Sequence, residues 1–416
     1  MFKDQNIITL FEAFSGVGTQ AMALKRLAKE LNFKLEVIGT SEIDKYAIRS
    51  YTAIHGDTVN FGSITDIQEI PQVDIFTYSF PCTDISNAGQ QKGFERGSGT
   101  RSGLLWEVER ILNNQKILGK LPKVLLLENV KALISKKFKA GFEEWLEVLE
   151  NIGYTNYWRV LNSKDYGIAQ NRERVFVVST LDGSDYQFPK AFELTTIIKD
   201  YLEDEVDQKY FLSTAQIQSI KNTNYDSMKL NRIKKIEDQY VNTITAFKGG
   251  RQETKIAYPL SSREFLLTGL KDISPAIAAR DYKDPKVIIT PAAIRNRPNE
   301  DGVNERNLES NKDTVTNTIT SFDKDNVLIF DWKSHSGYSG IPNSKIAPSQ
   351  MAQEHYGITD GLVIRKLTPL ESWRLMGITD EDFYKAQAVN SNSQLYKQAG
   401  NAIVVNVLYY IFKQLF

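Results

Sequence analysis

The sequence is nearly free of cysteine, with one residue, Cys82, in 416. A single cysteine excludes an internal disulfide and supplies too little sulfur for a cysteine-based metal site. Cys82 is therefore either a small buried apolar residue, which is the commoner case, or a reactive thiol. The sequence also lacks an apolar run long enough to span a bilayer, and its start has no basic leader with a small-residue cleavage site. These absences predict an intracellular, cytoplasmic protein without a membrane anchor.

An excess of charge of either sign is missing as well. The chain has 51 Lys and Arg against 51 Asp and Glu, which gives a formal net charge of +0. A polyanionic partner would therefore have to be bound by a local basic surface. With 41% hydrophobic and 25% charged residues, the composition is that of a globular chain of two or three domains.

Short apolar runs alternate in the first 180 residues with longer segments of helical spacing. This alternation predicts a mostly parallel α/β sheet. In such a sheet, ligands bind beyond the carboxyl ends of the strands. The expected strands are 7–14, 35–42, 73–80, 123–130 and 174–180, and the expected helices are 19–31, 101–114 and 141–153.

A glycine-rich turn follows the first expected strand. Gly16 and Gly18 would let the backbone turn sharply and approach a ligand, and Glu42 follows Gly18 by 24 residues, near the spacing of a ribose-binding acid. Gln20 and Ala21 stand where a phosphate-binding loop has its last glycine. The pattern favours a nucleoside ligand without a pyrophosphate, such as S-adenosylmethionine. It also fits an ordinary glycine turn followed by a solvated acid.

The third expected strand ends in "SFPC". Pro81 stiffens the chain as it leaves the sheet, so Cys82 is expected on a loop at the ligand edge, a position that favours a nucleophile. The fourth strand ends with Glu128 at the same edge, although a solvated strand-end glutamate is the simpler interpretation. Arg172 and Arg174 alternate with Glu173 and should face one side of an incoming strand. Two guanidinium groups suit phosphate or a polarised carbonyl, but one could instead pair with an acid.

The ordered motifs "FEAFSGVGTQ", "SEIDKYA", "YSFPCTDISNAGQQKGF", "LLLENV", "LNSKDYGIAQNRERVFVV", "RKLTPLESWRLMGI" and "QLYKQAGNAIVVNVL" are similar to those of the bacterial DNA (cytosine-5) methyltransferases. The similarity covers residues 8–181 and 363–411. It implies a Rossmann-like S-adenosylmethionine-dependent fold, with helices on both faces of the sheet, plus a smaller β-rich target-recognition domain. The implied domains are a catalytic domain at 1–188, a target-recognition domain at 189–380 and a returning segment at 381–416.

The resemblance also implies a mechanism. The Cys82 thiolate, aimed by Pro81, adds to C6 of a cytosine flipped out of duplex DNA, and C5 then takes the methyl group. Glu128 hydrogen-bonds to N3 and the exocyclic amine, and Arg174 holds O2. Arg172 helps to order the loop and a neighbouring phosphate. The products include S-adenosylhomocysteine, and no metal is required.

The cofactor contacts implied by the family motifs lie at the turn, at the ribose acid and in three later segments. Thr19 and Ile43 depart from the residues common in the family, and Ser63 replaces an acid, although Asp66 is close. Adenine contacts are therefore less well defined than ribose contacts. The implied contacts are Phe14, Ser15, Gly16, Val17, Gly18, Glu42, Ile43, Ser63, Ile64, Leu104 and Asn401.

From residue 189 to about 362 the composition shifts to Asn, Ser, Thr, Asp and Lys, as expected of a β-rich module with loops. Candidates for contacts with DNA bases or phosphates are Lys248, Arg251, Arg280 and Lys283. We expect a monomer whose partner is double-stranded DNA. A restriction endonuclease paired with it in function need not contact the chain. Three alternatives are a nicotinamide dehydrogenase, a noncatalytic DNA-binding relative and a tRNA cytosine-5 methyltransferase. The size of the variable region favours DNA.

Overall fold

The chain divides into two compact units. The computed structural model describes residues 1–85, 92–211, 233–235, 240–242, 255–259, 287–298, 304–310, 326–332, 358–359 and 362–416. Unit 1 consists of Met1–Leu202, Ile236–Thr254 and Leu367–Phe416, and unit 2 of Glu203–Lys235 and Lys255–Lys366.

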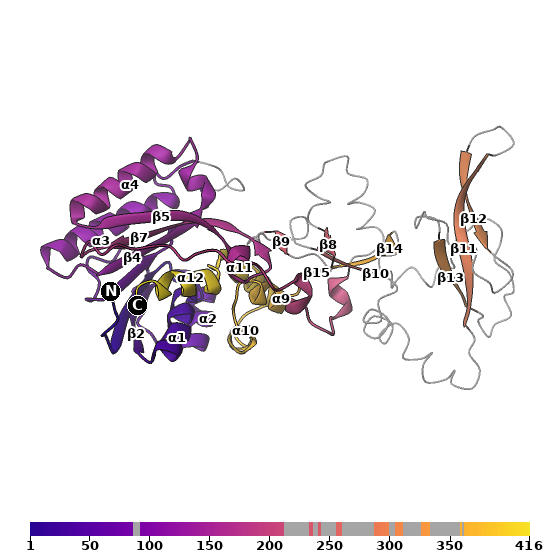
Figure 1. Cartoon of the computed structure of the whole chain (residues 1–416), viewed down its shortest axis with the longest axis horizontal. Helices are drawn as coiled ribbons and strands as arrows, with labels where there is room; N and C mark the ends of the chain where they lie inside the picture. Colours follow the sequence, from indigo (N-terminus) through magenta and orange to yellow (C-terminus); the bar gives the residue numbers. More distant parts are fainter. Residues whose placement is uncertain are drawn as a thin grey trace. The chain divides into compact units, whose positions relative to one another are not determined.

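Unit 1 contains a six-stranded sheet with the strand order β2-β1-β3-β4-β7-β5 (Figure 1). The first four strands of the chain are parallel, whereas β7 runs antiparallel to both of its neighbours. The expected mostly parallel α/β sheet is therefore confirmed. The strands are β1 (Ile7–Ala13), β2 (Lys34–Ser41), β3 (Ile75–Tyr78), β4 (Val124–Val130), β5 (Thr155–Asn162) and β7 (Glu173–Thr180). A separate short pair joins β6 (Gln170–Asn171) to β9 (Val241–Asn242).

Helices cover both faces of this sheet, with α3 and α4 on one side and α1, α2 and α12 on the other (Figure 1). The helices of unit 1 are α1 (Thr19–Leu31), α2 (Lys45–His55), α3 (Leu105–Ile117), α4 (Lys139–Ile152), α9 (Pro369–Arg374), α10 (Asp380–Gln387), α11 (Asn392–Asn401) and α12 (Val405–Lys413). Short 3-10 turns are η1 (Ser102–Leu104), η2 (Lys131–Ile134), η3 (Ser163–Tyr166) and η4 (Ile198–Tyr201). The sequence pattern did not predict α2 or β5.

Strand alternation explains how the core is built. Every second side chain of the central strands packs against α3 and α4, because successive side chains of a strand point to opposite faces. Trp145 of α4 is fully buried in this core, and its Nε1 donates to the Tyr78 hydroxyl at 3.3 Å. The strand residues of this face are Phe11, Ala13, Phe76, Tyr78, Leu125, Leu127, Val175 and Val177. The intervening positions face the other side and include two buried glutamates, Glu12 and Glu128.

The C-terminal segment belongs to unit 1. The backbone of Phe2 donates to Leu415 O at 2.9 Å, which places the two chain ends together. Helix α9 begins with Thr368 as N-cap and Pro369 at its first turn. The small domain predicted from the sequence at 189–380 includes 189–202 and 367–380. In the structure both segments lie in unit 1, and within it Arg374 donates to the Leu202 carbonyl at 3.2 Å.

The described regular elements of unit 2 are strands and one 3-10 turn, η5 (Gln208–Tyr210). One sheet has the order β14-β15-β10-β8 and the other the order β12-β11-β13. The strands are β8 (Ile233–Lys235), β10 (Lys255–Pro259), β11 (Val287–Pro298), β12 (Asn304–Ser310), β13 (Asn326–Trp332), β14 (Ile358–Thr359) and β15 (Leu362–Lys366). Across the described parts of the chain, no helix combines the length and apolar character needed to cross a membrane.

Candidate active site

The predicted catalytic side chains gather at one edge of the sheet in unit 1. Cys82 follows β3, and Glu128 lies near the end of β4. Because β7 runs antiparallel to β4, its first residues lie at the same edge, and Arg174 pairs in register with Val130. The two arginines around the beginning of β7 therefore lie at the same edge of the sheet as the residues at the ends of the parallel strands.

Glu128 is buried, with 8% of its surface exposed. Its Oε1 lies 3.3 Å from Arg174 Nε, yet this oxygen has no hydrogen-bond partner among the described residues. Burial raises the pKa of Glu128, and the charges of Arg174 and Arg172 oppose this rise. A buried carboxyl oxygen that makes no hydrogen bond keeps the capacity to bind a polar group of a ligand at this position.

Cys82 is half-buried, and burial raises the pKa of its thiol. The negative charge of Glu128 raises it further, whereas the charges of Arg174 and Arg172 lower it. The thiol therefore rests in its protonated form, unlike the activated thiolates of many cysteine enzymes. A proton must leave Cys82 before the sulfur can act as a nucleophile.

Arg172 is more buried than a phosphate-binding residue would be, with 4% of its surface exposed. Its guanidinium donates to Gly400 O at 3.2 Å and to Ala402 O at 2.9 Å, on either side of Asn401. Burial and the charge of Arg174 lower the pKa of Arg172 to about 9, which leaves it charged at neutral pH. This placement favours an ordering role for Arg172 over a contact with phosphate.

The turn after β1 is joined to the end of β2 by Glu42. Glu42 Oε2 accepts from Gly16 N at 2.9 Å, and its Oε1 accepts from Ile43 N at 2.9 Å and from Asp44 N at 2.8 Å. Phe14 adopts a left-handed conformation, with φ of 55°, and its backbone donates to Ser41 O at 2.7 Å. The turn is therefore held in shape without a ligand.

The same turn leaves a space lined by polar groups. No described atom lies within 4 Å of the position that a Cβ on Gly16 would occupy. The hydroxyl of Ser15 is buried and has no hydrogen-bond partner among the described residues. Carboxylate oxygens accept more than one hydrogen bond, so Glu42 keeps acceptor capacity here. The Ser15 hydroxyl and the Glu42 carboxylate could therefore accept hydrogen bonds from the ribose hydroxyl groups of a nucleoside.

Helix α2 packs against the turn, a contact that the sequence pattern does not predict. A Cβ on Gly18, whose φ is 79°, would lie 2.6 Å from Tyr51 and would also collide with His55. His55 Nε2 donates to Val17 O at 3.0 Å, and Lys25 Nζ donates to His55 Nδ1 at 2.9 Å. Gly18 is therefore required both for its conformation and for the close approach of α2.

The other predicted cofactor residues are placed around this turn. Ile64 is 3% exposed and its side chain is part of the core, whereas Ile43 is 74% exposed. Leu104 is half-buried at the start of α3, and Asn401 is exposed at the end of α11. The segment that contains Ser63 is half-exposed, so its polar atoms remain available to a ligand.

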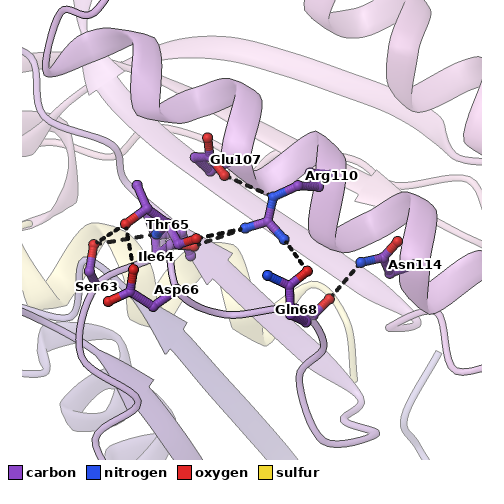
Figure 2. A network of polar contacts seen from close by, with 8 residues as sticks. All are labelled: Ser63, Ile64, Thr65, Asp66, Gln68, Glu107, Arg110 and Asn114. Atoms are coloured by element: carbon purple, nitrogen blue, oxygen red, sulfur yellow. Dashed lines mark hydrogen bonds and ion pairs between the residues drawn. The ribbon is translucent and has the colours of Figure 1, made fainter.

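A polar network fixes this segment to α3 (Figure 2). Arg110 donates to the carbonyls of Ile64 and Thr65, each at 3.3 Å, and pairs with Glu107 at 2.9 Å. Asn114 donates to Gln68 O at 2.8 Å. The Ser63 hydroxyl lies 2.7 Å from Thr65 Oγ1, which donates to Asp66 at 3.1 Å. Asp66, noted above as a nearby acid, thus belongs to the same network.

The predicted DNA contacts Lys248, Arg251, Arg280 and Lys283 lie outside the described residues. Among the described residues, no group of three or more His, Cys, Asp or Glu side chains is placed to hold a metal ion.

Comparison with known proteins gives a consistent result. The family model described as "C-5 cytosine-specific DNA methylase" matches residues 8–416. The chain is 31% identical to the type II methyltransferase M2.ScrFI of Lactococcus lactis subsp. cremoris over 99% of each chain. It is 28% identical to the orphan methyltransferase M.SPBetaI of Bacillus phage SPbeta, covering 98% of this chain and 97% of that protein.

Solved structures match the fold over the full length. Entamoeba histolytica methyltransferase EhMeth has a TM-score of 0.60 and 17% identity, covering 99% of this chain and 98% of that one. The Dnmt2 methyltransferase of S. pombe has a TM-score of 0.56 and 17% identity, covering 98% of each chain. At this identity the two structures support the fold alone.

Proposed function

Because the chain belongs to the family of C-5 cytosine-specific DNA methylases, we propose that Cys82 is the nucleophile with which it methylates cytosine in double-stranded DNA. The observation that carries this assignment is the shared edge of the sheet. There the charge of Glu128 raises the pKa of the Cys82 thiol, and the charges of Arg174 and Arg172 lower it. The sole cysteine of the chain thus lies beside a carboxyl group and two guanidinium groups.

The chemistry follows from the resting state of the thiol. After Cys82 loses its proton, the sulfur forms a bond to C6 of the cytosine, and the electron pair of the C5–C6 double bond becomes available at C5. S-adenosylmethionine, bound beside Gly16, would supply the methyl group that C5 accepts and would be converted to S-adenosylhomocysteine. Transfer of the C5 proton to a base from solvent then restores the double bond, and the Cys82 thiolate leaves with the electron pair of the C–S bond. None of these steps calls for a metal.

Glu128 and Arg174 act on the ring. The raised pKa of Glu128 supports a role as a proton-bearing donor to N3 of the cytosine, which would neutralise charge that develops during attack by sulfur. Arg174 would hold O2 of the base, and Pro81 would aim the thiol. Arg172 would keep the turn at Asn401 beside the site through its bonds to the flanking carbonyls.

The cofactor would occupy the space beside Gly16. Ser15 and Glu42 fit the hydroxyl groups of the ribose, and the exposed side chain of Ile43 offers an apolar surface for the adenine. The remaining contacts are those named by the family motifs, namely Phe14, Val17, Gly18, Ser63, Ile64, Leu104 and Asn401.

The target cytosine must leave the base stack before sulfur can reach C6. We assign the chemistry to unit 1 and the recognition of DNA sequence to unit 2 and to the segment with Lys248 and Arg251. The protein would act as a cytoplasmic monomer in a bacterial cell or a phage-infected host. It would protect DNA from a paired endonuclease that it need not touch.

A covalent trap tests the assignment directly. Duplex DNA of mixed sequence is prepared by PCR with 5-fluoro-dCTP in place of dCTP, so that any recognised site carries the trap. With S-adenosylmethionine, the wild-type protein should form an adduct that survives denaturant, because fluorine on C5 blocks release of the enzyme. Peptide mapping should locate the adduct at Cys82.

The matched variant Cys82→Ala should bind the same duplex and form no adduct. Ordinary cytosine duplexes serve as the control, since they should accept a labelled methyl group without trapping the protein. Bisulfite sequencing of these duplexes would identify the methylated site. An adduct that maps to another residue, or that also forms with Cys82→Ala, contradicts the assignment.

A further inference from the structure

One buried hydroxyl contacts the chain on both sides of Cys82. Ser102, which is 0% exposed, is the first residue of η1. Its Oγ donates to Pro81 O at 2.6 Å and accepts from Asp84 N at 3.3 Å. Its own backbone N donates to Asp84 Oδ2 at 3.2 Å. Cys82 and Thr83 are therefore enclosed in a ring of hydrogen bonds that closes through a residue 21 positions from Pro81.

Neighbouring contacts hold the same backbone. Asn129, which follows Glu128 in β4, donates from Nδ2 to Phe80 O at 3.0 Å. The backbone of Ile85 donates to Cys82 O at 3.1 Å. The three carbonyls of residues 80–82 thus each accept a hydrogen bond, two of them from side chains. Of the three donors, the Ser102 hydroxyl is the one that contacts the backbone both before and after Cys82, at Pro81 and at Asp84.

The position of Ser102 also links the thiol to the cofactor region. Ser102 lies two residues before Leu104, a proposed cofactor contact, and η1 leads directly into α3. A shift of this turn would therefore move the backbone that carries Cys82. Removal of the hydroxyl would leave the Pro81 carbonyl and the Asp84 amide without this partner, and an unsatisfied buried group favours rearrangement of the local backbone.

We infer that Ser102, together with Asp84, is a positioning residue that aims the Cys82 sulfur at the base. This inference rests on the proposed role of Cys82. Ser102 acts through the backbone of residues 81–84 and does not itself contact the reacting atoms. Because attack requires close alignment of sulfur and carbon, a displacement of about 1 Å slows it by on the order of 100-fold.

The test compares four variants of the full chain. Ser102→Ala removes the hydroxyl, and Ser102→Thr retains one. Asp84→Ala removes the acceptor of the Ser102 amide at a half-buried site, which keeps the inference testable if Ser102→Ala fails to fold. Ser98→Ala is the matched control, because Ser98 is an exposed serine nearby whose hydroxyl contacts Thr100 at 2.9 Å.

Four quantities are measured for each protein. They are the single-turnover rate of adduct formation on the 5-fluorocytosine duplexes, the dissociation constants for S-adenosylmethionine and for duplex DNA, and the melting temperature. Ser102→Ala and Asp84→Ala should slow the adduct about 10- to 100-fold, with both dissociation constants within about twofold of wild type. Ser102→Thr should recover most of the rate, and Ser98→Ala should match wild type.

Three results overturn the inference: a wild-type rate in folded Ser102→Ala or Asp84→Ala, a rate loss matched by an equal loss of cofactor affinity, or no recovery in folded Ser102→Thr. The second result would mean that Ser102 supports the cofactor region and not the thiol. If the wild-type protein forms no adduct at Cys82, the proposed function fails, and this inference fails with it. A wild-type adduct with an unaffected Ser102→Ala rate refutes the positioning role alone.

Discussion

Glu12 should make unit 1 less stable as the pH rises. This β1 residue is 0% exposed, and its carboxylate accepts from Ala21 N at 3.1 Å and from the Tyr51 hydroxyl at 2.6 Å. Burial raises the pKa of Glu12 from 4.5 to about 7, against the opposing effects of these two hydrogen bonds and the charge of Lys25. Burial also lowers the pKa of the neighbouring His55 to about 3, so His55 stays neutral over the same range.

The sign and size of the effect follow from these values. A carboxyl whose folded pKa exceeds its unfolded pKa binds its proton more tightly in the native state. Its stabilising contribution is complete below the unfolded pKa of 4.5 and is lost as the pH rises to about 7. The difference between the two pKa values corresponds to about 3 kcal/mol, of which roughly 2–3 kcal/mol should be lost between pH 5 and pH 8.

The assay compares wild type with Glu12→Gln by urea unfolding from pH 5 to pH 8. Tryptophan fluorescence is suitable, because Trp106, Trp145 and Trp373 all belong to unit 1. The unfolding free energy of wild type, relative to Glu12→Gln, should fall by roughly 2–3 kcal/mol across this range. Glu36→Gln, at a partly exposed glutamate paired with Lys34 on β2, is the matched control and should follow wild type. A difference that stays constant, or that rises with pH, would contradict a raised pKa of Glu12 in the folded protein.

Two further predictions concern the active site. Because Cys82 is the only cysteine, its alkylation by iodoacetamide reports its ionisation, and the rate should keep rising above pH 9. Glu128→Gln should move this profile to lower pH, since it abolishes the charge by which the ionised form of Glu128 raises the pKa of the thiol. A profile that levels off below pH 8, or one unchanged by Glu128→Gln, contradicts this. Gly18→Ala should lower the melting temperature more than Gly16→Ala, because only the former meets Tyr51 and His55. Gly16→Ala should instead weaken the binding of S-adenosylmethionine, which a titration measures. Equal losses of melting temperature in the two variants would contradict the different roles assigned to Gly16 and Gly18.

Some of the fold and site could be predicted from local pattern. The apolar runs that became β1, β3, β4 and β7 are nearly continuous, as expected of buried strands. Strand β5 lacks such a run, because it lies at the edge of the sheet and Trp158 on it is 46% exposed. The glycine turn alone left a dehydrogenase open, and only the order of all the motifs distinguished a methyltransferase.

The boundary between the units was harder to predict. The composition of a segment indicates whether its residues are exposed, but it does not indicate which part of the chain they pack against. The segment after β7 is poor in regular structure, yet Tyr186 in it is buried and donates to Ile411 O of α12 at 3.1 Å. Unit 1 consequently extends to Leu202. The assignment of DNA recognition to unit 2 stays a prediction.

The family, the nucleophile predicted for it and the edge of the sheet where its chemistry should lie all follow from the sequence, because short motifs and strand polarity encode them. The residues that support these features become visible only in the folded chain. His55 and Tyr51 pack behind Gly18, Ser102 encloses Cys82, and Arg172 is buried against the turn at Asn401. Such contacts join residues many positions apart. They depend on how the whole chain closes around its core, which no local pattern records.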